Sequence, residues 1–279
     1  MTVFLARRQQ FGVVGSTNDV VRGWLAEGTP EVCLAVADEQ SAGRGRAGRT
    51  WVAPSGSALL LSLGFRPSWL DPERAWRLAA VSALAMADAA EAVAGLPDGS
   101  IRLKWPNDLV VEADGSGLES NAVADDGVRK LAGLLGETDG LGTADPRIAI
   151  GLGINSDWPA TDFPPELAGA MTSLREALGG RPIDSAALLD AFLERVEARV
   201  EGLRDGRFDT AGWQARQVTT GRVIRLERPT GTETVRALGV DVATGALLVH
   251  DTSMPDGQRP VIVGEISHVR LASPARAGV

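Results

Sequence analysis

A loop that sets three arginines among three glycines is the first stretch of this sequence whose residue types suggest chemistry. It has the sequence QSAGRGRAGRTW over residues 40–51 and holds only one charge sign, in a chain whose net charge at pH 7 is −8. Glycines let backbone amides approach a ligand closely, and arginines present planar forks of donors that match phosphate or carboxylate. The composition predicts a flap that closes over a small anion, with a solvated surface loop as the alternative.

Lysine is a rare residue type in this chain. Of 28 basic residues only Lys104 and Lys130 are lysine, and asparagine is also scarce. Lysine supplies a compact ammonium charge where arginine supplies a wide planar fork. In a chain biased toward Arg, Ala and Gly, we expect such rare types at positions where their chemistry has no substitute. The asparagines are Asn18, Asn107, Asn121 and Asn155.

Lys104 begins the motif KWPND, which ends at Asp108. Pro106 stiffens the turn and keeps the residue before it out of helical conformation, so the polar side chains project from a rigid corner. An asparagine and a carboxylate beside a lysine suit a Mg²⁺–phosphate site, because Mg²⁺ is held through few protein ligands. A tight Asn-Asp turn with no ligand is the alternative.

Three further short motifs carry polar residues next to predicted elements. GSTN at residues 15–18 precedes an apolar-periodic helix, where its side chains can cap the helix and face a neighbouring ligand. KLAG at residues 130–133 places Lys130 at the head of an apolar strand, and GLGIN at residues 151–155 ends on Asn155. The glycine spacing of GLGIN matches neither a P-loop nor a dinucleotide fingerprint.

The elements that must position these motifs predict a mixed α/β domain. Apolar runs predict strands at residues 31–37, 57–65, 101–104, 109–111, 131–137 and 147–152. Apolar periodicity predicts helices at residues 19–26, 71–94, 166–178 and 186–204. Residues 112–129 are rich in Gly and acidic residues, which predicts an exposed hairpin tip or a disordered loop.

The pattern changes after residue 221 to short strands separated by turns. The strands are expected at residues 222–226, 234–242, 246–250, 260–263 and 268–271. This pattern indicates a small all-β module. We therefore divide the chain into a first domain, residues 1–218, and a β-module, residues 219–279.

The composition argues against several classes of protein. A pI near 4.9 argues against nucleic-acid binding by bulk charge. The sequence holds no run of 18 apolar residues and no apolar signal core, so we expect a cytoplasmic protein without a membrane span. A single Cys33 excludes an internal disulfide and fits a buried strand, while His250 and His268 are too few for a His-rich metal site.

Taken in order, the motifs STN, QxAGRGRxGRxW, KWPND, KLAG and GxGIN resemble bacterial biotin protein ligase over residues 15–155. A weaker match, GEIS at residues 264–267, resembles the C-terminal β-module of that family. The resemblance implies an α/β (α+β) fold: a catalytic domain with a mixed β-sheet flanked by helices, then a small SH3-like β-barrel. Only 15 residues precede Ser16, so we expect the short form without an N-terminal helix-turn-helix repressor domain.

The resemblance also implies a two-step, ATP-dependent reaction with Mg²⁺. Biotin is activated as biotinyl-5′-AMP with release of diphosphate. It is then transferred to a lysine of the biotin carboxyl carrier protein domain of a biotin-dependent carboxylase. No nucleic-acid or membrane partner is expected.

The resemblance assigns roles to individual residues. The catalytic residues would be Lys130, Arg46, Arg44 and Arg49, with Lys130 bridging the biotin carboxylate and the adenylate phosphate. Biotin would contact Ser16, Thr17, Asn18, Gln40, Gly43, Arg44, Trp51 and Lys130. ATP or the adenylate would contact Arg46, Arg49, Lys104, Asn107, Asn155 and Arg270. The metal ligands would be Asp108 and Asn155.

Two alternatives remain at this point. A lipoate or octanoate ligase or transferase of the same superfamily shares the architecture, but its signatures lack the Gly-Arg run followed by KWPND. A non-enzymatic RNA-binding protein that uses the Gly-Arg loop belongs to another class. Such segments usually repeat in basic, disordered surroundings, whereas this one occurs once between predicted strands.

Overall fold

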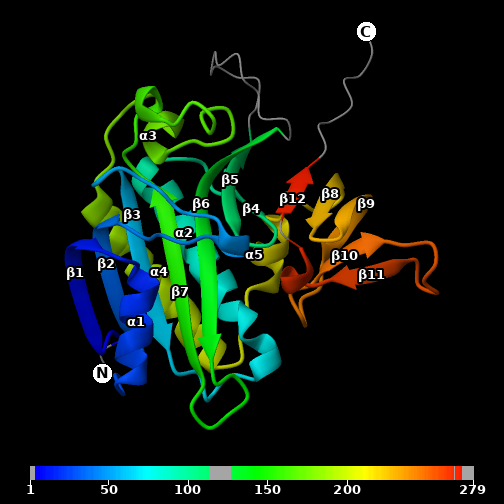
Figure 1. The fold of residues 1–279 in the computed structure, drawn as a ribbon, viewed down its shortest axis with the longest axis horizontal. Helices are drawn as coiled ribbons and strands as arrows, with labels where there is room; N and C mark the ends of the chain where they lie inside the picture. The colour runs from blue at the N-terminus through cyan, green and yellow to red at the C-terminus, as the bar shows by residue number, and fades with distance from the viewer. Residues whose placement is uncertain (1–3, 113–126, 267, 272–279) are drawn as a thin grey trace.

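Two β-sheets organise the molecule, which was obtained as a computed structural model (Figure 1). The structure describes residues 4–112, 127–266 and 268–271. The larger sheet has seven strands in the order β1-β2-β3-β7-β6-β5-β4, and the smaller has five in the order β11-β10-β9-β8-β12. The mixed α/β fold predicted from the sequence is confirmed.

The larger sheet is mixed. Only β1 and β2 run parallel; the other neighbours pair antiparallel. The strands are β1 (Arg7–Val14), β2 (Cys33–Gln40), β3 (Ala58–Phe65), β4 (Ile101–Lys104), β5 (Asp108–Glu112), β6 (Val128–Asp139) and β7 (Arg147–Asn155).

Both faces of this sheet are covered, which explains why β2 is apolar at successive positions. Cys33 and Ala35 pack with residues of helix α1 (Thr17–Ala26) on one face. Leu34 and Val36 belong to the main core on the opposite face, with α2 (Trp76–Ala94) and α4 (Ser185–Arg204). Figure 1 shows α1 in front of the sheet and α2 with α4 behind it.

A buried ionic cluster joins α2 to Arg216. The Glu91 side chain, only 2% exposed, accepts from Arg216 at 2.7 Å and from the Ile101 N–H at 2.7 Å. Arg216 also pairs with Asp88 at 2.7 Å. Burial alone would raise the pKa of Glu91, but hydrogen bonds from Arg216 and from two backbone N–H groups lower it below its ordinary value.

The smaller sheet forms the predicted C-terminal β-module. Its strands are β8 (Val223–Arg228), β9 (Gly231–Val240), β10 (Leu247–His250), β11 (Gln258–Val261) and β12 (His268–Leu271). The Asp241–Ala246 turn of this module contacts the part of the chain that holds the larger sheet. The Trp105 indole N–H donates to Gly245 O at 2.9 Å. Gly245 has φ +73° and lies so close to Trp76 that a Cβ would come within 2.8 Å of that ring. The boundary at residues 218 and 219 stays a prediction.

One predicted helix is wrong in most of its length. Residues 166–173 form turns and a bridge, and only α3 (Leu174–Ala177) is helical. The backbone of this segment pairs with Lys130 instead: the Lys130 N–H donates to Ala170 O at 2.8 Å, and the Thr172 N–H donates to Lys130 O at 2.9 Å. Ser173 then caps α3 by accepting from the Glu176 N–H.

Other differences are smaller. The edge strand β1 and the short α5 (Thr210–Ala215) were not predicted. Ser16 occupies the N-cap position of α1, but its side chain makes no capping hydrogen bond. Most of the predicted loop 112–129 lies outside the described residues. None of the helices in the described ranges is long and apolar enough to cross a membrane.

Candidate active site

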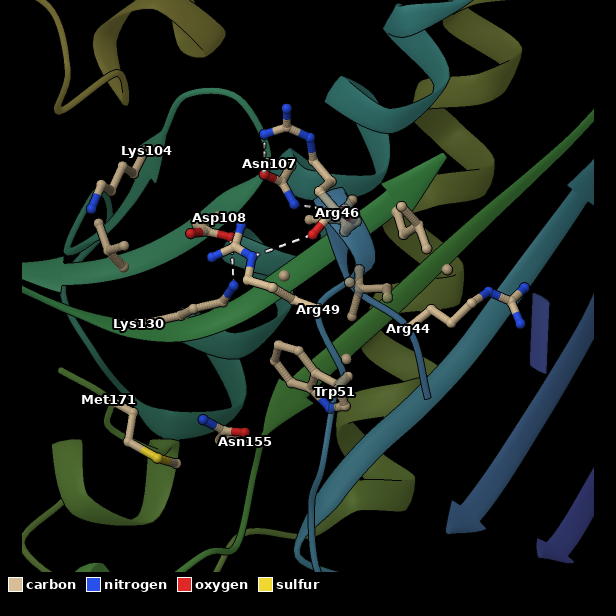
Figure 2. Close-up of a pocket in the computed structure, with 18 of the residues that line it drawn as sticks. Arg44, Arg46, Arg49, Trp51, Lys104, Asn107, Asp108, Lys130, Asn155 and Met171 are labelled. Atoms are coloured by element: carbon tan, nitrogen blue, oxygen red, sulfur yellow. Dashed lines mark hydrogen bonds and ion pairs between the residues drawn. The ribbon is translucent and has the colours of Figure 1, made fainter. Parts of the chain in front are cut away.

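One cavity of about 750 Å³ gathers nearly all the predicted site residues. It lies between the 43–51 loop, strands β5, β6 and β7 of the large sheet, and strands β8 and β12 of the C-terminal module. Every predicted site residue except Gly43 lines it. Figure 2 shows Arg46 and Arg49 of the loop beside Asp108 of β5 and Lys130 of β6, with Arg44 farther away.

The cavity is strongly cationic. Seven basic residues line it within the described part of the chain: Arg44, Arg46, Arg49, Lys104, Lys130, Arg225 and Arg270. Asp108 is the one acidic residue among these described lining residues. A cationic cavity in a chain of net charge −8 concentrates anions at this place.

Lys130 lines the cavity beside Asp108 and Trp51. Its Nζ lies 2.7 Å from Asp108 Oδ1 and 5.4 Å from the centroid of the Trp51 ring. The Lys130 side chain is one-third exposed, whereas that of Asp108 is 15% exposed. The ammonium group is therefore held at a fixed place by a carboxylate and an aromatic face while it stays accessible to a ligand.

The Trp51 ring packs directly against two glycines. Gly133 of β6 and Gly153 of β7 are direct cross-strand partners. A Cβ on Gly153 would come within 2.7 Å of the Trp51 ring, and one on Gly133 within 3.1 Å of that ring and of Lys130 Nζ. These glycines are therefore required because the indole occupies the space of their missing side chains.

Gly43 acts on the same loop from outside the cavity. Its carbonyl accepts from the Trp51 N–H at 3.0 Å, which closes the base of the loop. A Cβ on Gly43 would lie only 2.4 Å from Trp51 O, so no larger residue fits without moving the backbone.

Polar side chains fill the end of the cavity beside α1. Gln40 Oε1 accepts from the Thr17 N–H at 2.7 Å and from the Thr17 hydroxyl at 3.0 Å. The buried Ser62 hydroxyl lies 2.7 Å from Thr17 Oγ1 and 2.6 Å from Asn18 Oδ1. This network fixes side chains that lie at the start of α1, and Ser16 completes the lining there.

Arg44 lies at the cavity edge with its charge balanced by two carboxylates. Its guanidinium donates to both oxygens of Asp19 at 2.7 Å and to Glu137 at 3.0 Å. The hydrogen bonds from Arg44 lower the pKa of Asp19, and those to Asp19 raise the pKa of Arg44. Glu137 also accepts from Asn18 Nδ2 at 2.6 Å.

Arg46 links the loop to the KWPND corner and to the C-terminal module. It donates to Val263 O at 2.8 Å, to Ile266 O at 3.0 Å and to Asn107 Oδ1 at 3.4 Å. Burial lowers the pKa of Arg46. Arg49 Nε in turn donates to Arg46 O at 3.3 Å, so the two arginines are braced together.

Hydrogen bonds between Asn107 and β6 fix the KWPND corner. Asn107 and Leu134 exchange hydrogen bonds: Asn107 Nδ2 donates to Leu134 O at 2.7 Å, and the Leu134 N–H donates to Asn107 O at 2.9 Å. Lys104 is 8% exposed and lines the cavity. The corner therefore presents Lys104 and Asp108 from two paired strands, β4 and β5.

Candidate metal ligands are few. Asn155 is buried and donates through Nδ2 to Thr172 O at 2.9 Å. Within the described ranges, no three or more His, Cys, Asp or Glu residues cluster as a metal site. With so few oxygen ligands from the protein, the site suits only a metal ion whose remaining ligands are water or substrate phosphates.

Sequence reasoning missed several residues in or beside the site, among them Asp19, Glu137, Ser62 and Arg225. Asp19 follows the STN motif directly, and Glu137 lies near the end of β6, the strand that holds Lys130 near its start. Neither position indicates from the sequence that Arg44 is its partner. Ser62 lies within an apolar strand, where a lone hydroxyl is the only signal. Arg225 alternates with buried residues along β8, which predicts a solvated face but not a cavity.

Comparisons with known proteins identify the family of this chain. The model of the biotin/lipoate A/B protein ligase family matches residues 11–155. The chain is 31% identical over 261 residues to the biotin–[acetyl-CoA-carboxylase] ligase of Mycobacterium tuberculosis, over 92% of this chain and 86% of that protein. It is 30% identical over 231 residues to the bifunctional ligase/repressor of Bacillus spizizenii, over 82% of this chain and 65% of that protein.

A solved structure supports the fold. The biotin protein ligase of Aquifex aeolicus, in complex with biotin and ATP, superposes with a TM-score of 0.74 at 23% identity. The match covers 95% of this chain and 99% of that one. With the family model matching more than half of the sequence, the chain belongs to the biotin/lipoate A/B protein ligase family.

Proposed function

We propose that this protein is a biotin protein ligase. It activates biotin with ATP as biotinyl-5′-AMP and transfers the biotinyl group to a lysine of a biotin carboxyl carrier protein domain. The observation that carries the proposal is that one cavity is lined by Lys130, by the Gly-Arg loop and by the polar side chains at the start of α1, Ser16 to Asn18. The names of the curated relatives support biotin as the substrate, and none of the relatives described above is a lipoate ligase or an RNA-binding protein.

The α1 end of the cavity suits the head of biotin. Ser16, Thr17 and Gln40 supply donors and acceptors for a ureido group, and Trp51 provides an apolar wall. A small apolar acid with one polar ring fits such a slot, because a few placed polar groups fix its orientation. The biotin carboxylate then lies toward Lys130.

Lys130 acts on the reacting anions. In the first step a carboxylate oxygen of biotin attacks the α-phosphorus of ATP, and the bond to the β-phosphate breaks with release of pyrophosphate. Two anions must meet, and the Lys130 ammonium lowers their repulsion and stabilises charge that develops on the phosphoryl oxygens. Asp108, at 2.7 Å, holds that ammonium in place.

Two arginines of the loop, Arg46 and Arg49, act on the phosphate groups. Arg46 and Arg49 lie on the KWPND side, where they can contact phosphate and shield the mixed anhydride from water. In the second step the neutral amine of the carrier lysine attacks the acyl carbon, AMP leaves with the electron pair of the acyl–phosphate bond, and the new amide nitrogen loses one proton to water. The Lys130 side chain is one-third exposed, which leaves the carrier amine a route to the acyl group beside it.

Mg²⁺ fits this site as an ion carried by the nucleotide. One cavity carboxylate, Asp108, and the Asn155 side chain are the protein groups that would hold it, together with substrate phosphates. When bound, the ion supplies charge neutralisation of the polyphosphate. A reaction that consumes ATP also fits the cytoplasm, the compartment expected from the sequence.

Calorimetry tests the proposed function. The protein is titrated with biotin, then with Mg-ATP in the presence of biotin, and separately with lipoate and with single-stranded RNA. We expect saturable binding of biotin and enhanced nucleotide binding after it, with no comparable binding of lipoate or RNA. Binding of lipoate in preference to biotin would instead support the other branch of the family.

A further inference from the structure

One turn of the C-terminal module is bound by side chains from outside the module. Three backbone carbonyls of the Asp241–Ala246 turn each accept a hydrogen bond from such a side chain. The pairs are Arg77 with Val242 O at 3.0 Å, Trp76 with Ala243 O at 3.3 Å and Trp105 with Gly245 O at 2.9 Å. We call Trp76, Arg77 and Trp105 the turn seat. None of the three is among the described residues that line the cavity.

The turn keeps its shape through its own hydrogen bonds. The Asp241 carboxylate accepts from the Ala243 N–H at 2.8 Å and from the Thr244 hydroxyl at 2.9 Å. The Gly245 N–H donates to Asp241 O at 2.7 Å. Because these bonds already form the turn, its contacts with the turn seat determine where the module lies.

The Trp76 ring leaves no space for a side chain at Gly245. The centroid of this ring lies 5.5 Å from that of Phe208 and 5.0 Å from that of Trp213. These neighbours restrict the ring, and a Cβ on Gly245 would come within 2.8 Å of it. The methyl group of a Gly245→Ala variant must therefore push the turn off its seat.

The module has a second attachment, at the loop that carries Arg46. Arg46 donates to Val263 O at 2.8 Å and to Ile266 O at 3.0 Å. The sequence predicts that this loop closes over an anion, so this attachment changes when the loop moves. The turn seat contains no residue of the loop and is independent of that movement.

The position of the module matters because the module forms part of the cavity wall. Ile224 of β8, Thr234 of β9 and Leu271 of β12 all line the cavity. A module that moved away from the larger sheet would therefore open the cavity to water.

We propose that Trp76, Arg77 and Trp105 are positioning residues that hold the C-terminal module as a fixed wall of the cavity. They thereby retain the adenylate until the carrier lysine reacts with it. This inference rests on the proposed adenylation. An adenylate that escapes is hydrolysed by water to biotin and AMP, and the emptied site consumes another ATP. A displaced module is therefore measured as pyrophosphate release that continues without a carrier.

Gly245→Ala tests the turn seat in the full-length protein. Without carrier, we expect the steady-state rate of pyrophosphate release to rise about tenfold, as the overpacked contact displaces the module. With carrier, the amount of biotinylated carrier should fall below that of pyrophosphate, whereas the wild type should form the two in equal amounts.

A second measurement needs no substrate. The Val218 N–H donates to Leu103 O at 2.9 Å, and the Trp105 N–H donates to Thr219 Oγ1 at 3.0 Å. Both bonds lie at the junction between the module and the rest of the chain. In Gly245→Ala these two amides should exchange with deuterium about tenfold faster than in the wild type.

Gly257→Ala is the matched control. Gly257 lies between β10 and β11 of the same module with φ +72°, against +73° at Gly245. A Cβ there would meet no described atom within 4 Å beyond its chain neighbours. Both substitutions carry the same backbone strain, and only Gly245→Ala adds a clash with Trp76. Gly257→Ala should therefore keep wild-type rates, and melting temperatures show that each variant is folded.

Removal of the ring separates the clash from other effects. Trp76→Leu should raise pyrophosphate release by itself, because it removes the hydrogen bond to Ala243 O. The addition of Gly245→Ala to Trp76→Leu should cause no further rise, since the methyl group has no ring to meet.

Three results would overturn the inference. The first is that Gly245→Ala behaves as Gly257→Ala in both measurements. The second is additive effects of Trp76→Leu and Gly245→Ala. The third is faster amide exchange at the junction with no rise in pyrophosphate release, which would show that the position of the module does not retain the adenylate. A wild-type protein that releases no pyrophosphate would refute the proposed function, and the exchange measurement distinguishes that outcome because it needs no substrate.

Discussion

Arg44 and Asp19 form a two-point ion pair, in which Nη1 and Nη2 each lie 2.7 Å from a different carboxylate oxygen. Glu137 accepts from the same guanidinium at 3.0 Å. Figure 2 shows the Arg44 side chain directed away from Lys130 and Asp108. This geometry favours an anchoring role, with the Arg44 side chain tying the start of the loop to α1 and β6.

The anchor makes Asp19 a determinant of biotin affinity. Asp19→Asn removes the charge that holds Arg44, so we expect the Kd for biotin to rise about threefold, in line with a partly exposed ion pair. The double variant with Arg44→Ala should bind no more weakly than Arg44→Ala alone, because both changes break one interaction. Calorimetry with biotin measures these constants.

Asp139→Asn is the control for that experiment. Asp139 lies on the same strand as Glu137 and pairs with Arg22 at 3.2 Å, without a contact to the loop. An equal loss in Asp139→Asn, or additive losses in the double variant, would refute the anchoring role.

A methyl group at Gly153 should displace Trp51. In Gly153→Ala the new Cβ would come within 2.7 to 2.9 Å of three indole atoms, so the ring must leave its position. We expect the Kd for biotin to rise by about tenfold or more, the loss of one well-packed aromatic contact. Gly136→Ala, whose Cβ would meet Ile150 Cδ1 at an ordinary 3.4 Å, should bind biotin normally. Normal binding by Gly153→Ala would show that Trp51 does not wall the biotin slot.

The sequence indicated much of the site because rare residue types carry information. Lys104, Lys130, Asn107 and Asn155 were singled out by scarcity, and all four line the cavity. The partners of these residues could not be predicted. The pairing of Arg44 with Asp19 and Glu137 depends on how α1 meets β6, a tertiary relationship that no local pattern encodes.

The fold was predictable where apolar periodicity was strong and failed where tertiary contacts prevailed. The long helices and buried strands follow their apolar spacing. The 166–178 segment has helical spacing, yet its backbone bonds to Lys130 and its Met171 packs beside Trp158. Strand β1 lies at the sheet edge with mostly exposed side chains, so it carries too few apolar residues for its period to be seen.

Glu91 should be a major contributor to stability. Glu91→Ala leaves the Arg216 guanidinium, only 13% exposed, without its main partner in a buried setting. We expect the free energy of unfolding to fall by about 3 kcal/mol, as for a buried ion pair that loses one member. Glu201→Ala, which removes an exposed i, i+3 pair with Arg204, should change it by about 0.5 kcal/mol or less. Urea denaturation measures both, and equal effects would contradict the account.

The same residue should make stability depend on pH. The folded pKa of Glu91 lies below its ordinary value of 4.5. Its contribution is therefore present above pH 4.5 and is lost as pH falls through the lowered folded pKa. Between pH 7 and about pH 3 the wild type should lose more unfolding free energy than Glu91→Ala. Urea titrations at the two pH values measure this, and identical losses would place the acid sensitivity elsewhere.

The most direct test of the central claim is the mass of a carrier domain after incubation with this protein, biotin and Mg-ATP. We predict that the carrier gains the mass of one biotinyl group, and that AMP and pyrophosphate form in equal amounts. With Lys130→Ala we predict pyrophosphate release slowed by about 10²-fold or more, the scale of one lost transition-state donor. A carrier of unchanged mass with the wild-type protein, or an undiminished rate with Lys130→Ala, would contradict the account.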